Sequence, residues 1–209
     1  MFDAGTITFR EFSMHEPLPL ATIQSAVLEF LRNRDDAVVF GAQAVNAYVD
    51  EPRMTQDIDL LSTRAEELAH ELQAFLHERF HIAVRIRTVG EGRGYRLFQV
   101  QKPRNRHLVD IRAVDTLPTA QRISQVLVIA PDELIAGKVI SYHQRRGKPK
   151  SGTDWRDLAM LLLTFPDLKQ ESSPVVKHLI SGGADRKILD IWSELVALEI
   201  QPEDEDDEF

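Results

Sequence analysis

A pair of aspartates one residue apart, Asp57 and Asp59, constrains the fold of this chain more than any other feature of its sequence. Residues 55–60 read as the start of a β-strand, in which side chains i and i+2 point to the same face. Both carboxylates therefore project side by side, while Ile58 and Leu60 point into a core. Two such carboxylates repel each other unless a cation lies between them, and Mg²⁺ prefers oxygen ligands together with substrate phosphates. The pair predicts a magnesium site.

A glycine turn precedes this strand. Residues 38–42 (Val-Val-Phe-Gly-Ala) read as a strand that passes directly into a short helix. A helix that starts at Gly41 leaves free backbone N–H groups, which attract phosphate together with the helix dipole. A phosphate site beside a metal-binding carboxylate pair is the minimal set of parts for phosphoryl or nucleotidyl transfer. We therefore expect Gly41 and Ala42 to contact the phosphates of a nucleotide.

The composition is typical of a soluble protein without thiol chemistry. With 209 residues, 43% of them hydrophobic, the chain suits one globular domain or a core domain with a helical extension. The absence of cysteine excludes disulfides and thiolate metal sites. Residues 1–4 lack the features of a secretory signal, and the apolar stretches are too short to span a bilayer. We expect a cytoplasmic protein with no membrane partner.

The net charge of −8 is distributed unevenly along the chain. Residues 203–208 carry six negative charges, so the rest of the chain carries −2, and we expect residues 201–209 to form a disordered acidic tail. By contrast, residues 79–112 hold nine Lys and Arg against Glu91 and Asp110, a net charge of +7. Such a basic segment indicates a surface for an anionic partner, and we expect an RNA acceptor, such as a tRNA end, rather than a small molecule.

Hydrophobic periodicity predicts an α+β fold in which a mixed β-sheet is flanked by helices. Residues 63–66 (Thr-Arg-Ala-Glu) also predict a capping box at the start of a helix. We divide the chain into an α/β core at residues 1–128, a C-terminal helical region at 129–200 and the acidic tail. The expected helices lie near residues 23–31, 44–48, 64–76, 131–146, 153–165, 174–180 and 184–200, and the expected strands near 37–40, 57–61, 84–87, 95–100 and 108–114.

Three further charged residues lie in apolar surroundings. Asp110 interrupts an apolar strand, and is either a third metal ligand or base, or a carboxylate paired with a nearby arginine. Lys138 falls in the apolar stripe of its helix, so it either meets a phosphate or an acidic residue, or extends its ammonium to solvent. Asp157 falls on the packing face of the next helix, where it either pairs with Lys138 or Arg156, or faces solvent.

The segment between these two helices is cationic, with Arg145, Arg146, Lys148 and Lys150. It either holds a triphosphate or a nucleic acid, or reflects the preference of cations for helix C-termini. We interpret Asp154 as an acidic residue of the following first turn. The seven histidines show no metal-ligand spacing.

These residues resemble the signature of the nucleotidyltransferase superfamily with the DNA polymerase β-like fold, in which a Gly-Ser or Gly-Gly turn and a short helix precede Asp-x-Asp and a later acidic residue. The matching positions are Gly41-Ala42, Asp57-Ile58-Asp59 and Asp110. Three further segments are similar to AbiEii-type nucleotidyltransferase toxins of bacterial toxin–antitoxin systems, which include the MenT-like enzymes. They are residues 130–138, the basic loop at residues 145–150, and residues 154–158 (Asp-Trp-Arg-Asp-Leu). The resemblance spans roughly residues 20–165.

The resemblance implies Mg²⁺-dependent transfer of a nucleoside monophosphate from an NTP to an acceptor hydroxyl, by a toxin with a cognate antitoxin protein. Asp57, Asp59 and Asp110 would bind the metal. Lys138 would contact the triphosphate, and Asp157 would support that lysine.

The glycine turn departs from the family pattern, because Ala42 stands where the family has Ser or Gly. Alanine offers no hydroxyl to a phosphate, so Gln43 or backbone N–H groups would have to compensate. We expect Arg145 and Lys148 to add cations to the nucleotide site. The departure leaves a rival interpretation, a nucleotide- or partner-binding module with weak or no catalysis. The three acids favour catalysis, because a binding module does not need them.

Overall fold

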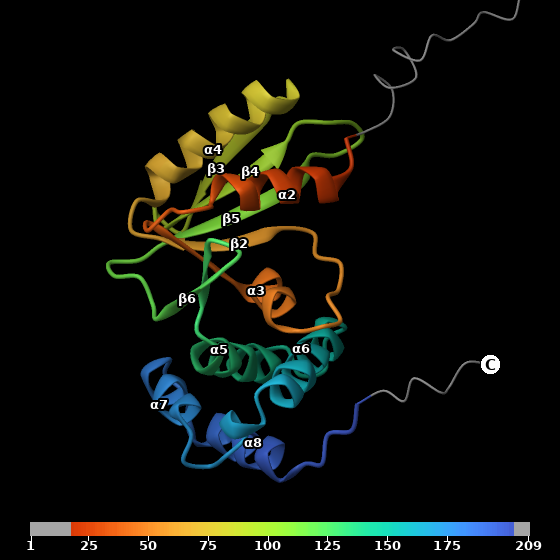
Figure 1. Ribbon diagram of the computed structural model, residues 1–209, viewed down its shortest axis with the longest axis vertical. Coiled ribbons are helices and arrows are strands. Elements are labelled where there is room, and N and C mark those ends of the chain that lie inside the picture. Colours follow the sequence, from red (N-terminus) through yellow and green to blue (C-terminus); the bar gives the residue numbers. More distant parts are fainter. Residues whose placement is uncertain (1–17, 203–209) are drawn as a thin grey trace, which may run out of the picture.

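A seven-stranded mixed sheet forms one half of the molecule, and a group of helices forms the other half (Figure 1). The computed structural model describes residues 18–202, so the acidic run predicted at residues 203–208 lies outside the described residues. The division into residues 1–128, 129–200 and 201–209 stays a prediction.

The sheet has parallel and antiparallel pairs. Its strands are β1 (Ala37–Phe40), β2 (Ile58–Ser62), β3 (Val84–Val89), β4 (Gly94–Gln99), β5 (Arg106–Ala113), β6 (Ala120–Ile123) and β7 (Val126–Ile129). Their order is β3-β4-β5-β2-β1-β7-β6. Strand β1 is antiparallel to β2 and parallel to β7, while β2 is parallel to β5 and β4 is antiparallel to both of its neighbours. The expected α+β architecture with a mixed sheet is confirmed.

Helices cover the sheet and extend beyond it. They are α2 (Leu20–Phe30), α3 (Gly41–Tyr48), α4 (Ala65–Phe80), α5 (Pro131–Gln144), α6 (Lys150–Thr164), the short 3₁₀ helix η1 (Pro166–Leu168), α7 (Pro174–Ser181) and α8 (Arg186–Ala197). Helices α2 and α4 contact each other, and α4 packs against β2, β3, β4 and β5. Helix α3 contacts β1 and β2 on one side and α5 and α6 on the other, so it joins the two halves of the molecule.

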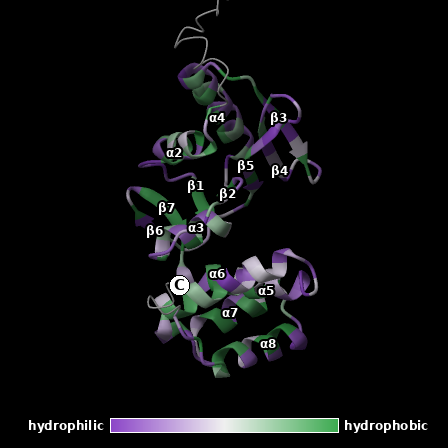
Figure 2. Cartoon of the chain, turned by 90° about the vertical axis from the view of Figure 1, so that its right-hand side faces the viewer, coloured by the Kyte–Doolittle hydropathy of each residue, from purple (hydrophilic) through white to green (hydrophobic). Residues whose placement is uncertain are grey.

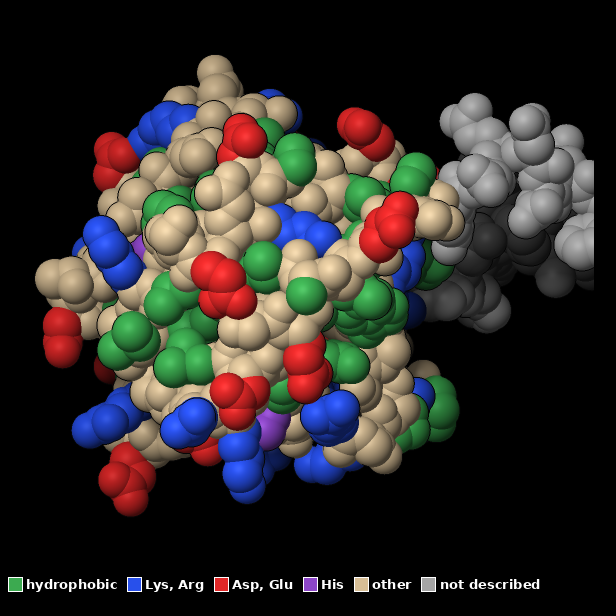
Figure 3. All heavy atoms as spheres, turned by 90° about the horizontal axis from the view of Figure 1, so that it is seen from below, with side chains coloured by type: hydrophobic (Ala, Val, Ile, Leu, Met, Phe, Trp, Pro, Cys, Tyr) green, Lys and Arg blue, Asp and Glu red, His purple; other side chains and the backbone are tan. Residues whose placement is uncertain are grey.

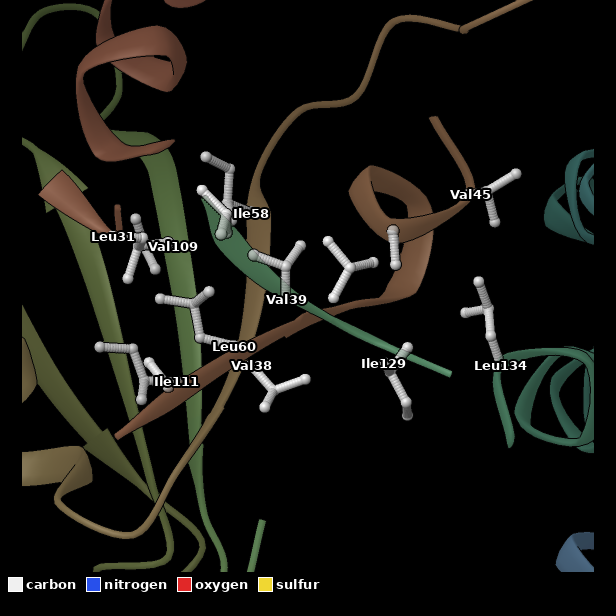
Figure 4. Packing of buried hydrophobic residues seen from close by; sticks show 14 of the residues in the cluster. Leu31, Val38, Val39, Val45, Ile58, Leu60, Val109, Ile111, Ile129 and Leu134 are labelled. Carbon is white, nitrogen blue, oxygen red and sulfur yellow. The ribbon is translucent and has the colours of Figure 1, made fainter. Parts of the chain in front are cut away.

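The apolar core lies around the central strands (Figure 4). Ile58 and Leu60 of β2 are fully buried, as is Val38 of β1. Burying a side chain of this size contributes about 1.5–3 kcal/mol. Because side chains alternate along a strand, the burial of Ile58 and Leu60 leaves Asp59 on the opposite face of β2.

The helical half has its own apolar packing. Helix α8 buries Ile188, Ile191, Trp192 and Leu195, which follow the i, i+3, i+4, i+7 spacing of an amphipathic helix. It contacts α5 and α7, and Figure 2 shows these helices as one group beside the sheet. On the outer end of this group, acidic and basic side chains are interspersed (Figure 3).

The hairpin formed by β6 and β7 was not predicted. A tight hairpin is usually recognised in a sequence by Asn-Gly or Asp-Gly at its turn, because both turn residues need a positive φ. Here the turn residues are Ser124 and Gln125, with φ values of 48° and 71°. The turn therefore carries no sequence signal.

The predicted capping box of α4 and the predicted start of α6 are wrong. Helix α4 has Arg64 as its N-cap with no side-chain cap, so residues 63–66 form no capping box. Instead, the Arg64 N–H donates to the Ser62 hydroxyl at 3.0 Å. Helix α6 begins at Lys150 rather than near Thr153, which places Asp154 beyond the first turn.

Candidate active site

A cleft of about 730 Å³ lies where the sheet meets α5 and α6. The strands and the loop before β2 contribute one wall, and the two helices contribute the other. Its acidic lining residues are Asp57, Asp59, Asp110, Glu133 and Asp154. Its cationic lining residues are Arg53, Arg96, Arg112, Lys138, Arg145 and Lys150. A ring of cations around carboxylates suits a ligand that brings both phosphates and a metal ion.

Asp59 lies at the centre of the sheet and touches the glycine turn. It is in register with Asp110 on the parallel strand β5 and with Phe40 on β1. Gly41 has a φ of 70°, and a Cβ at this position would lie 2.3 Å from the Asp59 Oδ2. Only glycine fits there, because it combines a positive φ with no side chain. The turn and the carboxylate are thus packed against each other.

Asp57 precedes β2, which begins at Ile58, and its carboxylate is held by His107 of β5. The distance from Asp57 Oδ2 to His107 Nδ1 is 2.8 Å. This hydrogen bond is the main cause that lowers the pKa of Asp57. By contrast, burial, followed by the neighbouring charge of Asp57, raises the pKa of Asp59 to about 6. The two carboxylates are therefore not equivalent: Asp57 has a polar partner, whereas burial disfavours the charged form of Asp59.

The carboxylates fit a metal that is shared with a substrate. Among residues 18–202, no three His, Asp or Glu side chains gather closely enough to hold a metal ion alone. Asp57 and Asp59 nevertheless line one cleft, and Mg²⁺ is commonly held by one or two carboxylates plus substrate phosphates and water. Asp110 is buried and accepts a hydrogen bond from Arg96 Nε to its Oδ2 at 3.1 Å, so only its Oδ1 is free of that arginine. Its role as a third ligand stays a prediction.

Lys138 and Asp157 form a buried ion pair. Lys138 is 8% exposed and Asp157 is fully buried, which rules out the solvent-facing alternative for each. Lys138 Nζ lies 2.5 Å from Asp157 Oδ2, and Arg53 binds the same carboxylate through Nε and Nη2 at 2.7 and 2.8 Å. Lys138 also lines the cleft, whereas Asp157 lies beneath it. Two cations share one carboxylate, so a net positive charge remains at this wall.

Two residues of the basic loop, Arg145 and Lys150, line the cleft. Arg145 Nη1 lies 3.0 Å from each oxygen of Asp154, which is 2% exposed. Asp154 is thus a buried ion-pair partner, and its interpretation as a first-turn acidic residue is wrong. Lys150 lines the cleft, but Lys148 does not. The predicted Gln43 also lies outside the lining, and its Oε1 accepts a hydrogen bond from the Thr55 hydroxyl at 3.3 Å.

The comparison with known families agrees with this geometry. A family model described as nucleotidyl transferase AbiEii toxin, type IV toxin–antitoxin system, matches residues 26–206. The chain belongs to the AbiEii family. It is therefore a nucleotidyltransferase by family, as the sequence resemblance implied. A search of curated proteins found no significant match.

Two solved structures share the fold of this AbiEii chain. The Megavirus polyadenylate synthase has a TM-score of 0.56 and 16% identity over 70% of this chain. This chain spans only 32% of that protein. JHP933 from Helicobacter pylori has a TM-score of 0.52 and 13% identity, and the match covers 84% of this chain and 89% of the JHP933 chain.

Every helix within residues 18–202 is too short or too polar to span a membrane.

Two residues of this AbiEii cleft were missed by sequence reasoning. Arg53 gave no signal, because its partner Asp157 is 104 residues away. His107 is three residues from Asp110, and in a regular strand the two would point to opposite faces. The pairing of β4 with β5 shifts register between Leu97 and Phe98, and this irregularity lets both side chains line the cleft.

Proposed function

We propose that this AbiEii protein transfers a nucleoside monophosphate from an NTP to an acceptor hydroxyl, with Mg²⁺ held by Asp57 and Asp59. The observation that carries the proposal is the environment of Asp59. This carboxylate is pressed against the turn at Gly41, has Asp57 beside it, and has no ion-pair partner among residues 18–202. A bound metal would neutralise triphosphate charge and polarise the α-phosphate. The charges of Arg112 and Lys138 offset that of Asp59 only in part, so without a bound cation the ionised carboxylate costs stability.

The residues around the cleft would divide the work of the reaction. Backbone N–H groups at the start of α3, beginning at Gly41, would contact phosphate oxygens. Lys138, Arg145 and Lys150 would neutralise the remaining triphosphate charge from the helical wall. The acceptor oxygen attacks the α-phosphorus, the bond from that phosphorus to the β-phosphate oxygen breaks, and pyrophosphate leaves. The free Oδ1 of Asp110 would accept the proton of the attacking hydroxyl.

For the acceptor we propose an RNA, such as a tRNA end. Residues directly opposite on neighbouring strands share a face, so the register places Arg87 and Arg96 in one row with Asp110. Arg85 lies in the adjacent row with Phe98 and His107. A row of arginines that leads from the edge strand β3 to the acidic centre suits a polyanion, whose phosphates contact several cations at once.

For the biological role we propose a toxin that is countered by a cognate antitoxin protein. The support is the description of the matching family as a type IV toxin–antitoxin system.

A second candidate function is nucleotide or partner binding with weak or no turnover. Ala42 favours it, because this position lines the cleft and offers no hydroxyl to a phosphate. The two candidates differ in one measurable product, the pyrophosphate that only nucleotidyl transfer releases.

The test is release of pyrophosphate from each NTP, with total tRNA present and with Mg²⁺ or EDTA. We expect release that requires Mg²⁺ and is lost in Asp57→Asn and Asp59→Asn. Asp190→Asn, an exposed carboxylate of α8, is the matched control and should retain activity. Binding of NTP without pyrophosphate release would favour the second candidate.

A further inference from the structure

His107 is held on two sides at the edge of the acidic centre. Its Nδ1 lies 2.8 Å from the Asp57 Oδ2. Its ring stacks on Phe98, with ring centroids 4.8 Å apart and an interplanar angle of 26°. Its Nε2 is buried and has no hydrogen-bond partner among the described residues. Contacts on the ring face and on one ring nitrogen leave the imidazole little freedom to rotate.

The hydrogen bond fixes the direction of the proton and the orientation of the carboxylate. Asp57 as a carboxylate only accepts, so His107 donates through Nδ1–H. That bond uses the Oδ2 of Asp57 and leaves its Oδ1 without this partner. Asp59 lies within β2, and its carboxylate is packed against Gly41. Asp57 lies just before β2, and its carboxylate has no such packing against the glycine turn. The contact with His107 is therefore what fixes the rotamer of Asp57.

We infer that His107 is a positioning residue, which orients Asp57 so that its Oδ1 can bind a divalent cation beside Asp59. The inference rests on the proposed function, because it assigns His107 to the metal site of that reaction. A histidine that orients a ligating carboxylate belongs to the outer shell of a metal site, and loss of such a partner typically weakens metal affinity about 10–100-fold. Phe98 contributes indirectly, because it stacks on the imidazole of His107 and fixes the plane of that ring.

The test measures the affinity for Mn²⁺, used as a probe for Mg²⁺, by electron paramagnetic resonance in the presence of a non-hydrolysable NTP analogue. His107→Leu removes the donor, and we expect Mn²⁺ to bind about 10-fold or more weakly. His107→Asn keeps an N–H donor near the position of Nδ1, and we expect it to restore most of the affinity. His70→Leu, an exposed histidine of α4, is the control and should bind as the wild type does.

Thermal unfolding in EDTA shows whether each variant is folded. If His107→Leu does not fold, Phe98→Leu replaces it, because this change keeps the donor but frees the ring, and it should weaken Mn²⁺ binding severalfold. If the folded variant, His107→Leu or its replacement Phe98→Leu, binds Mn²⁺ with wild-type affinity, the role of His107 is overturned. The proposed function would then still stand. Absence of Mn²⁺ binding by the wild type would instead contradict the metal site itself, and the role of His107 with it.

Discussion

At the scale of single residues, neutralisation of the two neighbouring carboxylates should have different effects on stability. The pKa of Asp59 is raised from its ordinary value of 3.8 to about 6, so the native state holds its proton more tightly than the unfolded state. Its contribution to stability is therefore full below about pH 4 and is lost as the pH rises through 6. In EDTA at pH 7, Asp59→Asn should be more stable than the wild type by about 2–3 kcal/mol, because it removes a carboxylate whose charged form the native state disfavours.

Urea unfolding between pH 4 and 8 checks this expectation, and the advantage of Asp59→Asn should shrink below pH 6 and vanish near pH 4. Asp57→Asn should show no such gain, because His107 lowers the pKa of Asp57 and already stabilises its charged form. The sequence alone predicted mutual repulsion for both residues. An advantage of Asp59→Asn that did not change with pH would mean that its cause is not this ionisation.

The glycine of the turn gives a second residue-scale prediction. Gly41→Ala introduces a Cβ at a φ of 70° and within 2.3 Å of the Asp59 carboxylate. Gly183→Ala meets a similar φ of 81° with nothing within 4 Å. Both changes should cost about 1–2 kcal/mol of backbone strain, but only Gly41→Ala should displace Asp59 and abolish pyrophosphate release. Equal activity of the two variants would show that the contact with Asp59 is unimportant.

At the scale of elements, one buried carboxylate joins α5, α6 and the loop before β2. Asp157 accepts hydrogen bonds from Lys138 and Arg53, and Asn46 holds the backbone of Arg53 at 2.8 and 3.0 Å. Asp157→Asn leaves two cations with no shared counter-charge, so it should lower the free energy of unfolding by about 3–5 kcal/mol. Glu51→Gln, which breaks the exposed pair with Arg156, should cost less than about 1 kcal/mol. Denaturant unfolding compares the two, and similar costs would contradict this role of Asp157.

The same elements show what the sequence can and cannot predict. The apolar stripe around Lys138 indicated either a lysine with a counter-charge or an ammonium extended to solvent, because helical spacing is visible in the sequence. Arg53 was not foreseen, since contacts across 104 residues leave no periodic pattern. The Asp-x-Asp strand and its glycine turn were predictable from local spacing. The position of His107 depends on a register irregularity between strands, which sequence spacing does not reveal.

At the scale of the whole molecule, an acidic protein carries Arg85, Arg87 and Arg96 on one face of its sheet. Wild-type binding to total tRNA should weaken steeply with salt, with a log–log slope of several units. Reversing Arg85 and Arg87 to Glu should weaken this binding without changing NTP affinity, because neither residue lines the cleft. Arg186→Glu with Lys187→Glu, on α8, makes an equal charge change and should have a smaller effect. Equal losses in the two double variants would mean that only net charge matters.

The direct test of nucleotidyl transfer follows the two ends of the triphosphate. The protein is incubated with Mg²⁺, total tRNA and an NTP labelled on either the α- or the γ-phosphate. We predict that the α-label becomes attached to the RNA, that the γ-label leaves as pyrophosphate, and that both events are lost in Asp59→Asn. Attachment of the γ-label to the acceptor, or α-label transfer that survives the loss of Asp59, would contradict the account.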